Sequence, residues 1–410
     1  MKLLVVMSYS PFPIRRGRDR LIKNLIDGLT VRHEVTLATM TLDASEEDAL
    51  TGIESSRFSV RFMRAPNKRS AFHRAWFKGV NLAKTVTALL PPQVSYARPA
   101  AFIEHVKRAA EEVQPDLVLA NYWHLYDLPL VLGACRSALI THDVDFLVSA
   151  ERTKRISNPF ERAMAQANAF LGERIERRAY ALYDTILTLT GKDAEAIADA
   201  TGGGGKRIMP LPLALDLQYY KPPELEREKN VILFFGALDA DFNRDALRFF
   251  VHEVFPEVRK ARPGCRCDCI GHGLDVSLRN ELPEGCTYLG GVDDVRPHLA
   301  RCACMALPLR FGGGVRIRMM EAAAMGTPVV STPVGVAGMG FERGGDYLEA
   351  VDARGIARSI LDLLGDEQLA RRIGASARRW ALGNISMDDY PDRLDACFAR
   401  LDITSSKSVR

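Results

Sequence analysis

Short apolar runs alternate with longer helical patterns along most of the chain, and this alternation restricts the fold more than any other feature. Runs with the length of buried strands are KLLVVMSY, HEVTLATM, DLVLAN, SALITHD and DTILTLT. Helical stretches lie between most of them, among them RDRLIKNLIDGLT and NPFERAMAQANAFLGERIERRAYALY. Strands that alternate with helices indicate an α/β fold, in which helices cover a parallel sheet.

The same pattern begins again in the second half of the chain. VILFFGALD is followed by a helical stretch, and further strand candidates are CRCDCIG, CTYLGG, CACMALPL and TPVVST. Between the halves lies LPLALDLQYYKPPELEREKN, a polar and proline-rich linker candidate. A chain of 410 residues also exceeds what one core usually supports. We therefore predict two Rossmann-like, doubly wound domains, residues 1–213 and 214–385, and a closing helix within 386–410 that packs back toward the first domain.

The composition is that of a soluble globular protein, with 47% hydrophobic and 26% charged residues. It contains no run of eighteen apolar residues, so no membrane-spanning helix is expected. The apolar N-terminus is too short for a signal peptide and lacks a cleavage site of small residues. Cys265, Cys267 and Cys269 alternate, a spacing that fits neither a zinc site nor a disulfide framework. We expect reduced thiols and a cytoplasmic protein.

Positive charge is concentrated in residues 57–110. This segment holds eleven Lys or Arg and one acid, so its net charge is +10 in a chain of net charge +4. Within it, Trp76 and Phe77 are interleaved with cations. One interpretation is a solvated basic helix. Another is a helix on an anionic membrane, where each surface-facing cation contributes up to ~1 kcal/mol, and the protein would then be peripheral on the inner face of the cell membrane. Nucleic acid is a weaker third interpretation and is not expected as a partner, because no reader motif accompanies the charge.

Two nucleotide-binding motifs are excluded. TGGGGK at 201–206 has the composition of a P-loop, but Ala200 stands where that motif needs glycine and Arg207 follows Lys206 in place of Ser or Thr. No G-x-G-x-x-G follows the first strand, which argues against a dinucleotide-dependent dehydrogenase. No cofactor is expected.

The segment RFGGGVRIRMMEAAAMG, residues 310–326, carries the strongest functional signal. Gly312, Gly313 and Gly314 lack a Cβ atom, so a ligand is able to approach the backbone closely. A helix that starts near Val315 would direct its unpaired N–H groups at whatever occupies this loop. Such donors favour an anion, and phosphate is the usual one.

Charged residues in the same segment extend this interpretation. Arg316 and Arg318 add cations near a helix N-terminus, where positive charge is unfavourable unless an anion is bound. Glu321 lies further along and is able to accept two hydroxyl hydrogen bonds, as from a ribose. Phosphate at the helix start and hydroxyls beyond it describe a nucleotide diphosphate sugar. The alternative is a tight glycine turn with a solvated Glu321, and the segment by itself does not decide between them.

RFGGGVRIRMMEAAAMGTPVVSTPVGVAGM resembles the donor-site segment of family 4 glycosyltransferases. These are retaining enzymes of the GT-B fold, in which two Rossmann-like domains face each other across a cleft. ILFFGALDADFNRDALRFF, YLGGVDDVRPHLARC and PLRFGGG follow the same order as in the family, and PFPIRRGRDRLIKNLIDGLTVRHEVTLAT is similar to its opening loop and helix. The likeness is strong over 231–338 and loose elsewhere. Within the family, the chain is most similar to the branch of bacterial polysaccharide assembly, in which a Gly-Gly-x-Arg form replaces the commoner loop that contains glutamate.

The resemblance implies an activity. A metal-independent hexosyltransferase would move a sugar from a UDP- or GDP-linked donor, held by the second domain, to a hydroxyl of a glycan or lipid-linked acceptor, held by the first. Two rivals remain open. A nucleotide-sugar epimerase of the same fold needs no acceptor, and a non-catalytic scaffold subunit would bind the nucleotide sugar without turnover.

In the second domain, the resemblance implies that Glu321 holds the ribose and that Gly236 and the 312–315 loop contact the donor. The chain departs from the family pattern in two places. Gly313 stands where the first glutamate of a pair is usual, and the cations that neutralise the diphosphate are absent near Ala237. Phe242 occupies roughly the second of these cation positions. We therefore expect Arg316 and Arg318 to replace them as catalytic residues.

In the first domain, THDVD places His142 at the carboxyl end of a strand, where α/β proteins form sites. A lone histidine there is more often structural, but the resemblance implies a catalytic position near the transferred sugar. Asp143 and Asp145 would orient the acceptor, and Gly17 and Arg18 would lie near the cleft.

Two D-x-D triplets are similar to the manganese motif of glycosyltransferases of another fold. They are Asp143-Val-Asp145 and Asp239-Ala-Asp241. Because the chain is not arranged like that fold, we expect no essential metal.

Overall fold

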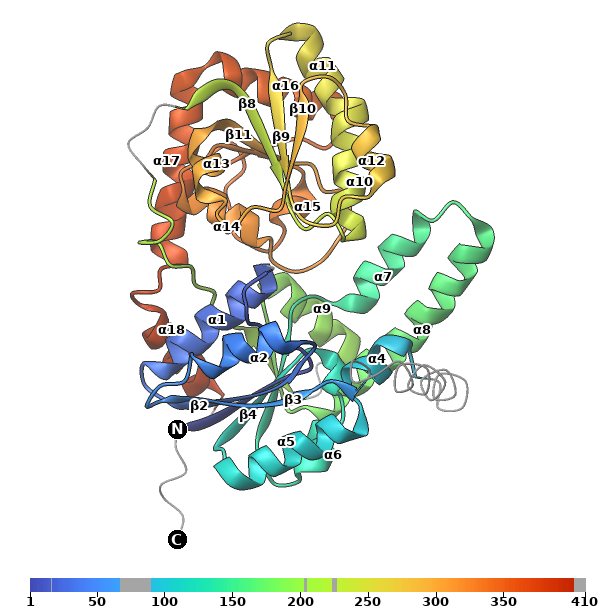
Figure 1. Ribbon diagram of the computed structural model, residues 1–410, viewed down its shortest axis with the longest axis vertical. Coiled ribbons are helices and arrows are strands. Elements are labelled where there is room, and N and C mark those ends of the chain that lie inside the picture. Colours follow the sequence, from blue (N-terminus) through green and yellow to red (C-terminus); the bar gives the residue numbers. More distant parts are fainter. Residues whose placement is uncertain (16, 67–89, 203–204, 223–226, 402–410) are drawn as a thin grey trace. The chain divides into compact units, whose positions relative to one another are not determined.

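A computed structural model (Figure 1) describes the chain except for residues 16, 67–89, 203–204, 223–226 and 402–410. The interleaved aromatic and basic stretch of the sequence therefore lies largely outside the described residues. The chain divides into two compact units: unit 1 comprises residues 1–213 and 388–410, and unit 2 comprises residues 214–387. Each unit is built on one sheet, and all strand pairings in both sheets are parallel. The predicted fold class, two parallel α/β domains, is confirmed.

Unit 1 contains a seven-stranded sheet of order β3-β2-β1-β4-β5-β6-β7. Its strands are β1 (Lys2–Met7), β2 (Glu34–Thr41), β3 (Phe58–Arg64), β4 (Leu117–Asn121), β5 (Ser137–Thr141), β6 (Thr185–Thr188) and β7 (Arg207–Pro210). The first three strands run outward from β1, and the chain then returns to its other side at β4. Loops that follow β1 and β4 therefore leave in opposite directions, which opens a crevice at the carboxyl ends of these strands.

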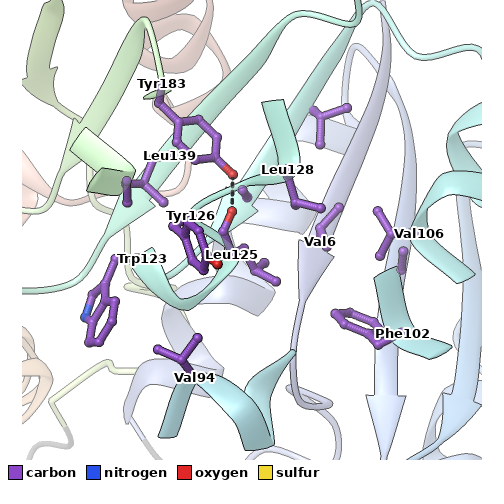
Figure 2. Packing of buried hydrophobic residues seen from close by; sticks show 14 of the residues in the cluster. Val6, Val94, Phe102, Val106, Trp123, Leu125, Tyr126, Leu128, Leu139 and Tyr183 are labelled. Atoms are coloured by element: carbon purple, nitrogen blue, oxygen red, sulfur yellow. Dashed lines mark hydrogen bonds between the residues drawn. The ribbon is translucent and has the colours of Figure 1, made fainter. Parts of the chain in front are cut away.

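The helices of unit 1 cover this sheet. They are α1 (Gly17–Thr30), α2 (Ala44–Thr51), α4 (Pro92–Ala97), α5 (Ala100–Val113), α6 (Leu128–Leu132), α7 (Asp145–Lys154), α8 (Pro159–Leu182), α9 (Gly191–Thr201) and α18 (Tyr390–Arg400), with a 3-10 turn at Trp123–Leu125. Residues of β4 are buried throughout, as expected of a strand covered on both faces. Figure 2 shows part of the core, where Tyr183 donates a hydrogen bond of 2.7 Å to the carbonyl of Leu125.

Unit 2 contains a six-stranded sheet of order β10-β9-β8-β11-β12-β13. Its strands are β8 (Glu228–Phe235), β9 (Arg266–Ile270), β10 (Cys286–Gly290), β11 (Cys302–Leu307), β12 (Val329–Ser331) and β13 (Leu348–Glu349). The order reverses between β8 and β11, so the second crevice lies at their carboxyl ends.

The helices of unit 2 are α10 (Asp241–Phe249), α11 (Phe255–Ala261), α12 (Val276–Asn280), α13 (Arg296–Arg301), α14 (Ile317–Ala324), α15 (Pro333–Val336), α16 (Ala353–Gly365) and α17 (Glu367–Asn384), with a π-helical segment at Phe250–Val254. Arg227, just before β8, fastens two of the loops. Its guanidinium group donates to the carbonyls of Leu299, Ala300, Cys302, Met325 and Gly326. A search of the described helices finds none with the length and apolar character needed to cross a membrane.

The C-terminal helix α18 belongs to unit 1, where it packs against α1. Tyr390 is buried beside Gly28, and a Cβ atom on Gly28 would lie 2.5 Å from the Tyr390 ring. Arg32, which follows α1, donates to Asp395 of α18 at 2.6 Å. Gly28 is therefore glycine because any larger side chain would displace the helix that completes this unit.

Gly28→Val is expected to destabilise unit 1 by about 1–3 kcal/mol, because overpacking forces Tyr390 out of its position. Urea unfolding at constant pH measures this change. Gly52→Val is the matched control, because a Cβ atom there meets no atom within 4 Å. Equal stability of the two variants would show that α18 is not packed on Gly28.

Candidate functional site

Two loops meet at the carboxyl ends of β8 and β11, and Arg318 of α14 joins them. Its Nη1 donates to the carbonyl of Phe235 and its Nη2 donates to Oδ1 of Asn243, both at 2.6 Å. A Cβ atom on Gly236 would lie 2.1 Å from Nη1, so any larger residue here would displace the guanidinium group of Arg318. The sequence places Arg318 far from β8, but the fold brings it to the loop in which cations were expected and not found.

Arg316 contacts the glycine loop that precedes α14 and also the segment that follows β8. It precedes the first residue of α14, and its Nη1 donates to the carbonyl of Gly313. Its guanidinium carbon is 5.3 Å from the centre of the Phe242 ring. Gly312 has φ = +124°, and a Cβ atom there would lie 2.6 Å from Nη2 of Arg316. The glycines thus let the arginine fold back beneath the loop.

The helix starts slightly later than the sequence pattern indicates. We predicted a start near Val315, but α14 begins at Ile317 with Arg316 in the capping position. Val315 and the three glycines before it form a partly exposed loop, whereas the arginines behind it are buried. Gly314 also has positive φ, +67°. The backbone of this loop is therefore the part that a ligand is able to reach.

The electrostatic environment of the arginine pair is unusual. Arg316 and Arg318 are only 8% and 7% exposed. Burial, with a further contribution from Arg316, lowers the pKa of Arg318 to about 9, and Glu321 acts in the opposite direction. Arg318 is still protonated at neutral pH, so two like charges lie in a poorly hydrated region. An anion bound at the loop would relieve this repulsion.

Glu321 is held by a residue that the sequence analysis missed. Tyr220, in the segment that follows the boundary between the units, donates its phenol proton to Oε1 of Glu321 at 2.5 Å. Both side chains are buried. The carbonyl of Tyr220 in turn accepts from Arg378 of α17 at 3.1 Å. This chain of contacts fixes the orientation of the Glu321 carboxylate.

In unit 1, His142 follows β5 and contacts the last residue of β4 and the residue after it. Its Nε2 lies 2.7 Å from Oδ1 of Asn121, and because this oxygen only accepts, Nε2 carries the proton. The imidazole stacks on Tyr122, with ring centres 4.3 Å apart. Burial and then Arg18 lower the pKa of His142 to about 3. His142 is therefore a neutral hydrogen-bonding group at any physiological pH.

Arg18, the second residue of α1, completes this cluster. Its guanidinium carbon lies 4.1 Å from the centre of the Tyr9 ring, and its Nε is 3.6 Å from Asp19. Burial by itself would lower the pKa of Arg18, but Tyr9, Tyr122 and Asp19 together raise it. Tyr122 has φ = +77°, a strained conformation that is common at functional sites. Gly17 begins α1 directly before Arg18 and is exposed.

The two aspartates after His142 differ in their surroundings. The carbonyl of Asp143 accepts from Thr141 Oγ1 at 2.6 Å. Asp145 begins α7, and burial raises its pKa despite a hydrogen bond from Trp123. The amide of Asp145 donates to Glu176 at 2.8 Å, and the next amide donates to the same carboxylate at 2.7 Å. The N-terminus of α7 is thus already occupied by a carboxylate of the protein.

Asp145 and Glu176 also line a cavity of about 150 Å³ between α7 and α8. Glu176 is fully buried, and desolvation raises its pKa to about 8. Tyr180 donates to it at 2.6 Å, so hydrogen bonds from the protein support its carboxylate. No cluster of three or more metal-ligating side chains occurs among the residues that the structure describes.

The expected site residues thus fall into two groups. Unit 1 brings His142 and Arg18 together on either side of the tyrosine pair. Unit 2 brings Gly236, Arg318, Arg316 and the 312–315 loop together, with Glu321 on the same helix. Sequence reasoning did not find the partners of these residues, which are Tyr9, Asn121, Tyr122, Tyr220 and Asn243. Tyr9 ends the strand candidate KLLVVMSY and Asn121 ends DLVLAN, so these two were visible as polar residues at the ends of expected strands.

Comparison with known proteins gives a consistent result. Residues 229–366 match the family model described as glycosyl transferases group 1. The matched residues lie within unit 2. A search of curated proteins found no match to this chain.

Solved structures with the same fold cover nearly the whole chain. Sucrose-phosphate synthase from Thermosynechococcus elongatus aligns with a TM-score of 0.72 at 16% identity, over 98% of this chain and 99% of that one. HepE from Anabaena in complex with UDP-glucose gives 0.68 at 15% identity, over 98% and 100%. WaaG, a glycosyltransferase involved in lipopolysaccharide biosynthesis, gives 0.64 at 14% identity, over 98% and 100%. The fold is therefore the two-domain GT-B fold that these structures share.

His142 makes a prediction about acid stability. Its pKa of about 3 in the folded state lies below the ordinary value of 6.5. Between these values the unfolded chain binds a proton that the folded chain does not, so stability is complete above pH 6.5 and is lost as the pH falls toward 3. One such proton contributes a slope of about 1.4 kcal/mol per pH unit.

His142→Gln keeps an N–H donor for Asn121 but does not titrate. Its unfolding free energy should therefore depend less steeply on pH between 6 and 4, by about one proton. Urea unfolding at a series of pH values, followed by tryptophan fluorescence, measures both slopes. Identical slopes would mean that His142 binds a proton in the folded protein as it does in the unfolded chain.

Proposed function

We propose that this protein is a retaining glycosyltransferase that transfers a sugar from a UDP- or GDP-linked donor to a hydroxyl of a glycan or lipid-linked acceptor in polysaccharide assembly. The observation that carries the proposal is the pair of buried arginines beside the glycine loop of unit 2. The family match over residues 229–366 supports it, as does the fold likeness to HepE, which was solved with UDP-glucose.

The donor diphosphate would lie on the backbone of the 312–315 loop. Arg316, directly behind this loop, stabilises the negative charge that develops on the leaving diphosphate. Arg318 contributes charge from deeper in the protein and holds Gly236 and the loop after β8 in place. Glu321, oriented by Tyr220, accepts from a ribose hydroxyl.

On the acceptor side, the proposal assigns His142 the role of a neutral hydrogen-bond donor or acceptor toward the transferred sugar. Its low pKa excludes a role as a cationic acid at neutral pH. The departing diphosphate accepts the proton of the attacking hydroxyl, so no side chain with a pKa near 7 is required. Positioning and charge stabilisation provide the catalysis. Arg18, Asp143 and Asp145 orient the acceptor.

Donor binding is the first test of this proposal. A ligand that binds only the native state raises the melting temperature, and at 100 times its Kd it adds about 2.7 kcal/mol of stability. We expect UDP- or GDP-sugars to raise the melting temperature of the protein, and the nucleosides without phosphate to have no effect. A panel in which no nucleotide sugar shifts the melting temperature would refute the proposal.

Arg316→Ala is expected to lower kcat/KM by a factor of about 100 or more, because it removes a cation from the leaving group. Its melting temperature without donor should change little or rise, because one of two repelling charges is lost. Arg371→Ala is the matched control, since the side chain of this arginine is 75% exposed on α17 and pairs with the carboxylate of Glu367 one turn earlier in the same helix. Wild-type turnover in Arg316→Ala would eliminate the assigned role.

The proposal also includes independence from metal ions. Dialysis against EDTA should leave transfer unchanged, because the two arginines supply the charge that a divalent cation supplies in other glycosyltransferases. Loss of transfer after EDTA, with recovery on addition of manganese or magnesium, would show that the D-x-D triplets bind a metal.

A non-catalytic scaffold subunit is the second candidate. One observation favours it: each arginine and Glu321 already bonds to a protein group, and glycine replaces the first glutamate at position 313. Donor binding without transfer to any acceptor extract would support the scaffold. Incubation with donor alone distinguishes an epimerase, because only an epimerase releases an altered nucleotide sugar.

A further inference from the structure

The first half of α8 exposes large apolar side chains to solvent. Phe160 is 73% exposed, Met164 is 61% exposed and Phe170 is 69% exposed. The spacing i, i+4, i+7, i+11 is that of Phe160, Met164, Ala167 and Leu171, so these four residues lie on one face of the helix. Phe170 lies beside them. We refer to these five residues as the α8 stripe.

The opposite face of α8 packs within unit 1. Figure 1 shows α7 and α8 as a hairpin that extends from the sheet of this unit. Residues that face α7 across the cavity are small or polar, among them Ala165, Ala169 and Gly172. A helix of a globular domain normally turns its large apolar residues toward the core. The first half of α8 has the reverse arrangement, which indicates a partner for the outer face.

The character of this face changes along the helix. Arg174 and Arg178 continue the spacing of the stripe, at i+14 and i+18 from Phe160, and both are exposed. Near the turn of the hairpin, Lys154 pairs with Glu151 and Arg162 donates to the carbonyl of Ile156, so the cations there are bonded within the protein. The outer face is thus apolar near the turn and basic toward the base of the hairpin.

A second copy of the chain fits this surface poorly. Three side chains of about 200 Å² each, at these exposed fractions, present roughly 400 Å². Two such faces would bury about 800 Å² in total, less than the ~1,200 Å² of a stable interface. A symmetric pair with the two helices parallel would also bring like charges together at the arginines, and an antiparallel pair would place these arginines against apolar side chains. An anionic surface with an apolar interior complements both parts.

We propose that the α8 stripe docks unit 1 on an anionic lipid bilayer. Phe160, Met164 and Phe170 enter the boundary between headgroups and acyl chains, and Arg174 and Arg178 contact lipid phosphates. The purpose of this docking rests on the proposed function, because a transferase that uses a lipid-linked acceptor benefits from being held at the membrane.

The docking surface differs from the one that the charge distribution predicts. Of the basic segment 57–110, residues 67–89 lie outside the described chain. Three of its described arginines pair with carboxylates from elsewhere in unit 1: Arg61 with Glu112, Arg64 with Glu47, and Arg98 with Asp127. Their charge is therefore partly neutralised within the protein, whereas the outer face of α8 presents apolar and basic groups together.

Vesicle flotation tests the proposal with the full chain. Wild-type protein should float with vesicles of 30% phosphatidylglycerol in phosphatidylcholine and bind at least tenfold less to phosphatidylcholine alone. The triple variant F160S/M164S/F170S should bind the anionic vesicles at least tenfold more weakly. Arg174→Glu should weaken binding at least fivefold and reduce its dependence on salt, because it removes a cation at the headgroup level.

The matched control is V276S/V351S/L382S, which changes three apolar residues of unit 2 that are 74%, 72% and 53% exposed. This control should bind vesicles like the wild type. Undiminished binding of the α8 variant would overturn the proposal. So would a wild-type dimer in light scattering that dissociates in this variant, since the stripe would then contact a second copy.

A fall in the melting temperature of the α8 variant by more than about 5 °C would also overturn it, because the side chains would then pack inside the protein. The nucleotide-sugar melting assay, run on the same samples, separates this result from the proposed function. A donor shift without vesicle binding rejects the docking surface alone, and vesicle binding without a donor shift rejects the transferase activity alone.

Discussion

The arrangement of unit 2 depends on a guanidinium group that is buried where the sheet order reverses. Arg318 reaches from α14 to the last residue of β8 and to the side chain of Asn243, and so connects the two loops that leave β8 and β11 in opposite directions. A charge in this position is costly to desolvate, and Arg316 nearby increases the cost. The fold keeps both charges because glycines at 236 and 312 make room for them. The burial of these two charges is costly, and it is also the reason for which we expect the loop to bind an anion.

The two units reach a similar arrangement with different chemistry. In unit 1, an arginine at the start of α1 lies among tyrosines and a neutral histidine at the carboxyl ends of β1, β4 and β5. In unit 2, two arginines lie beneath a glycine loop. Parallel sheets bring the ends of strands that are distant in sequence to one edge, so each cluster gathers residues from at least two crossovers. Neither cluster supplies a side chain that titrates near neutrality by virtue of its geometry, which suits a reaction in which the leaving group accepts the proton.

Strands with uninterrupted apolar runs were predictable from the sequence, because burial on both faces leaves a clear signal. The strands that were missed are β3, β7 and β13. In β3, FSVRFMR, two arginines interrupt the apolar run, and the other two strands have only four and two residues. A glycine loop directly before a charged helix start was also predictable at 312–321, and its role in binding a donor stays a prediction. The contacts of that site were not, since Tyr220 and Asn243 reach it through tertiary packing that no local pattern records.

The C-terminal helix α18 completes unit 1. Unit 1 is therefore formed by two separate stretches of the chain, and unit 2 is a single stretch inserted between them. Cutting the polypeptide near residue 213 would not yield an intact N-terminal fragment, since Tyr390 and Arg393 of α18 bond to the carbonyls of Pro212 and Leu213 from the far end of the sequence. Unit 2 is feasible in principle as a separately expressed single stretch. Unit 1 would need a short artificial connection in place of unit 2. This makes the protein a candidate for topological re-engineering rather than truncation.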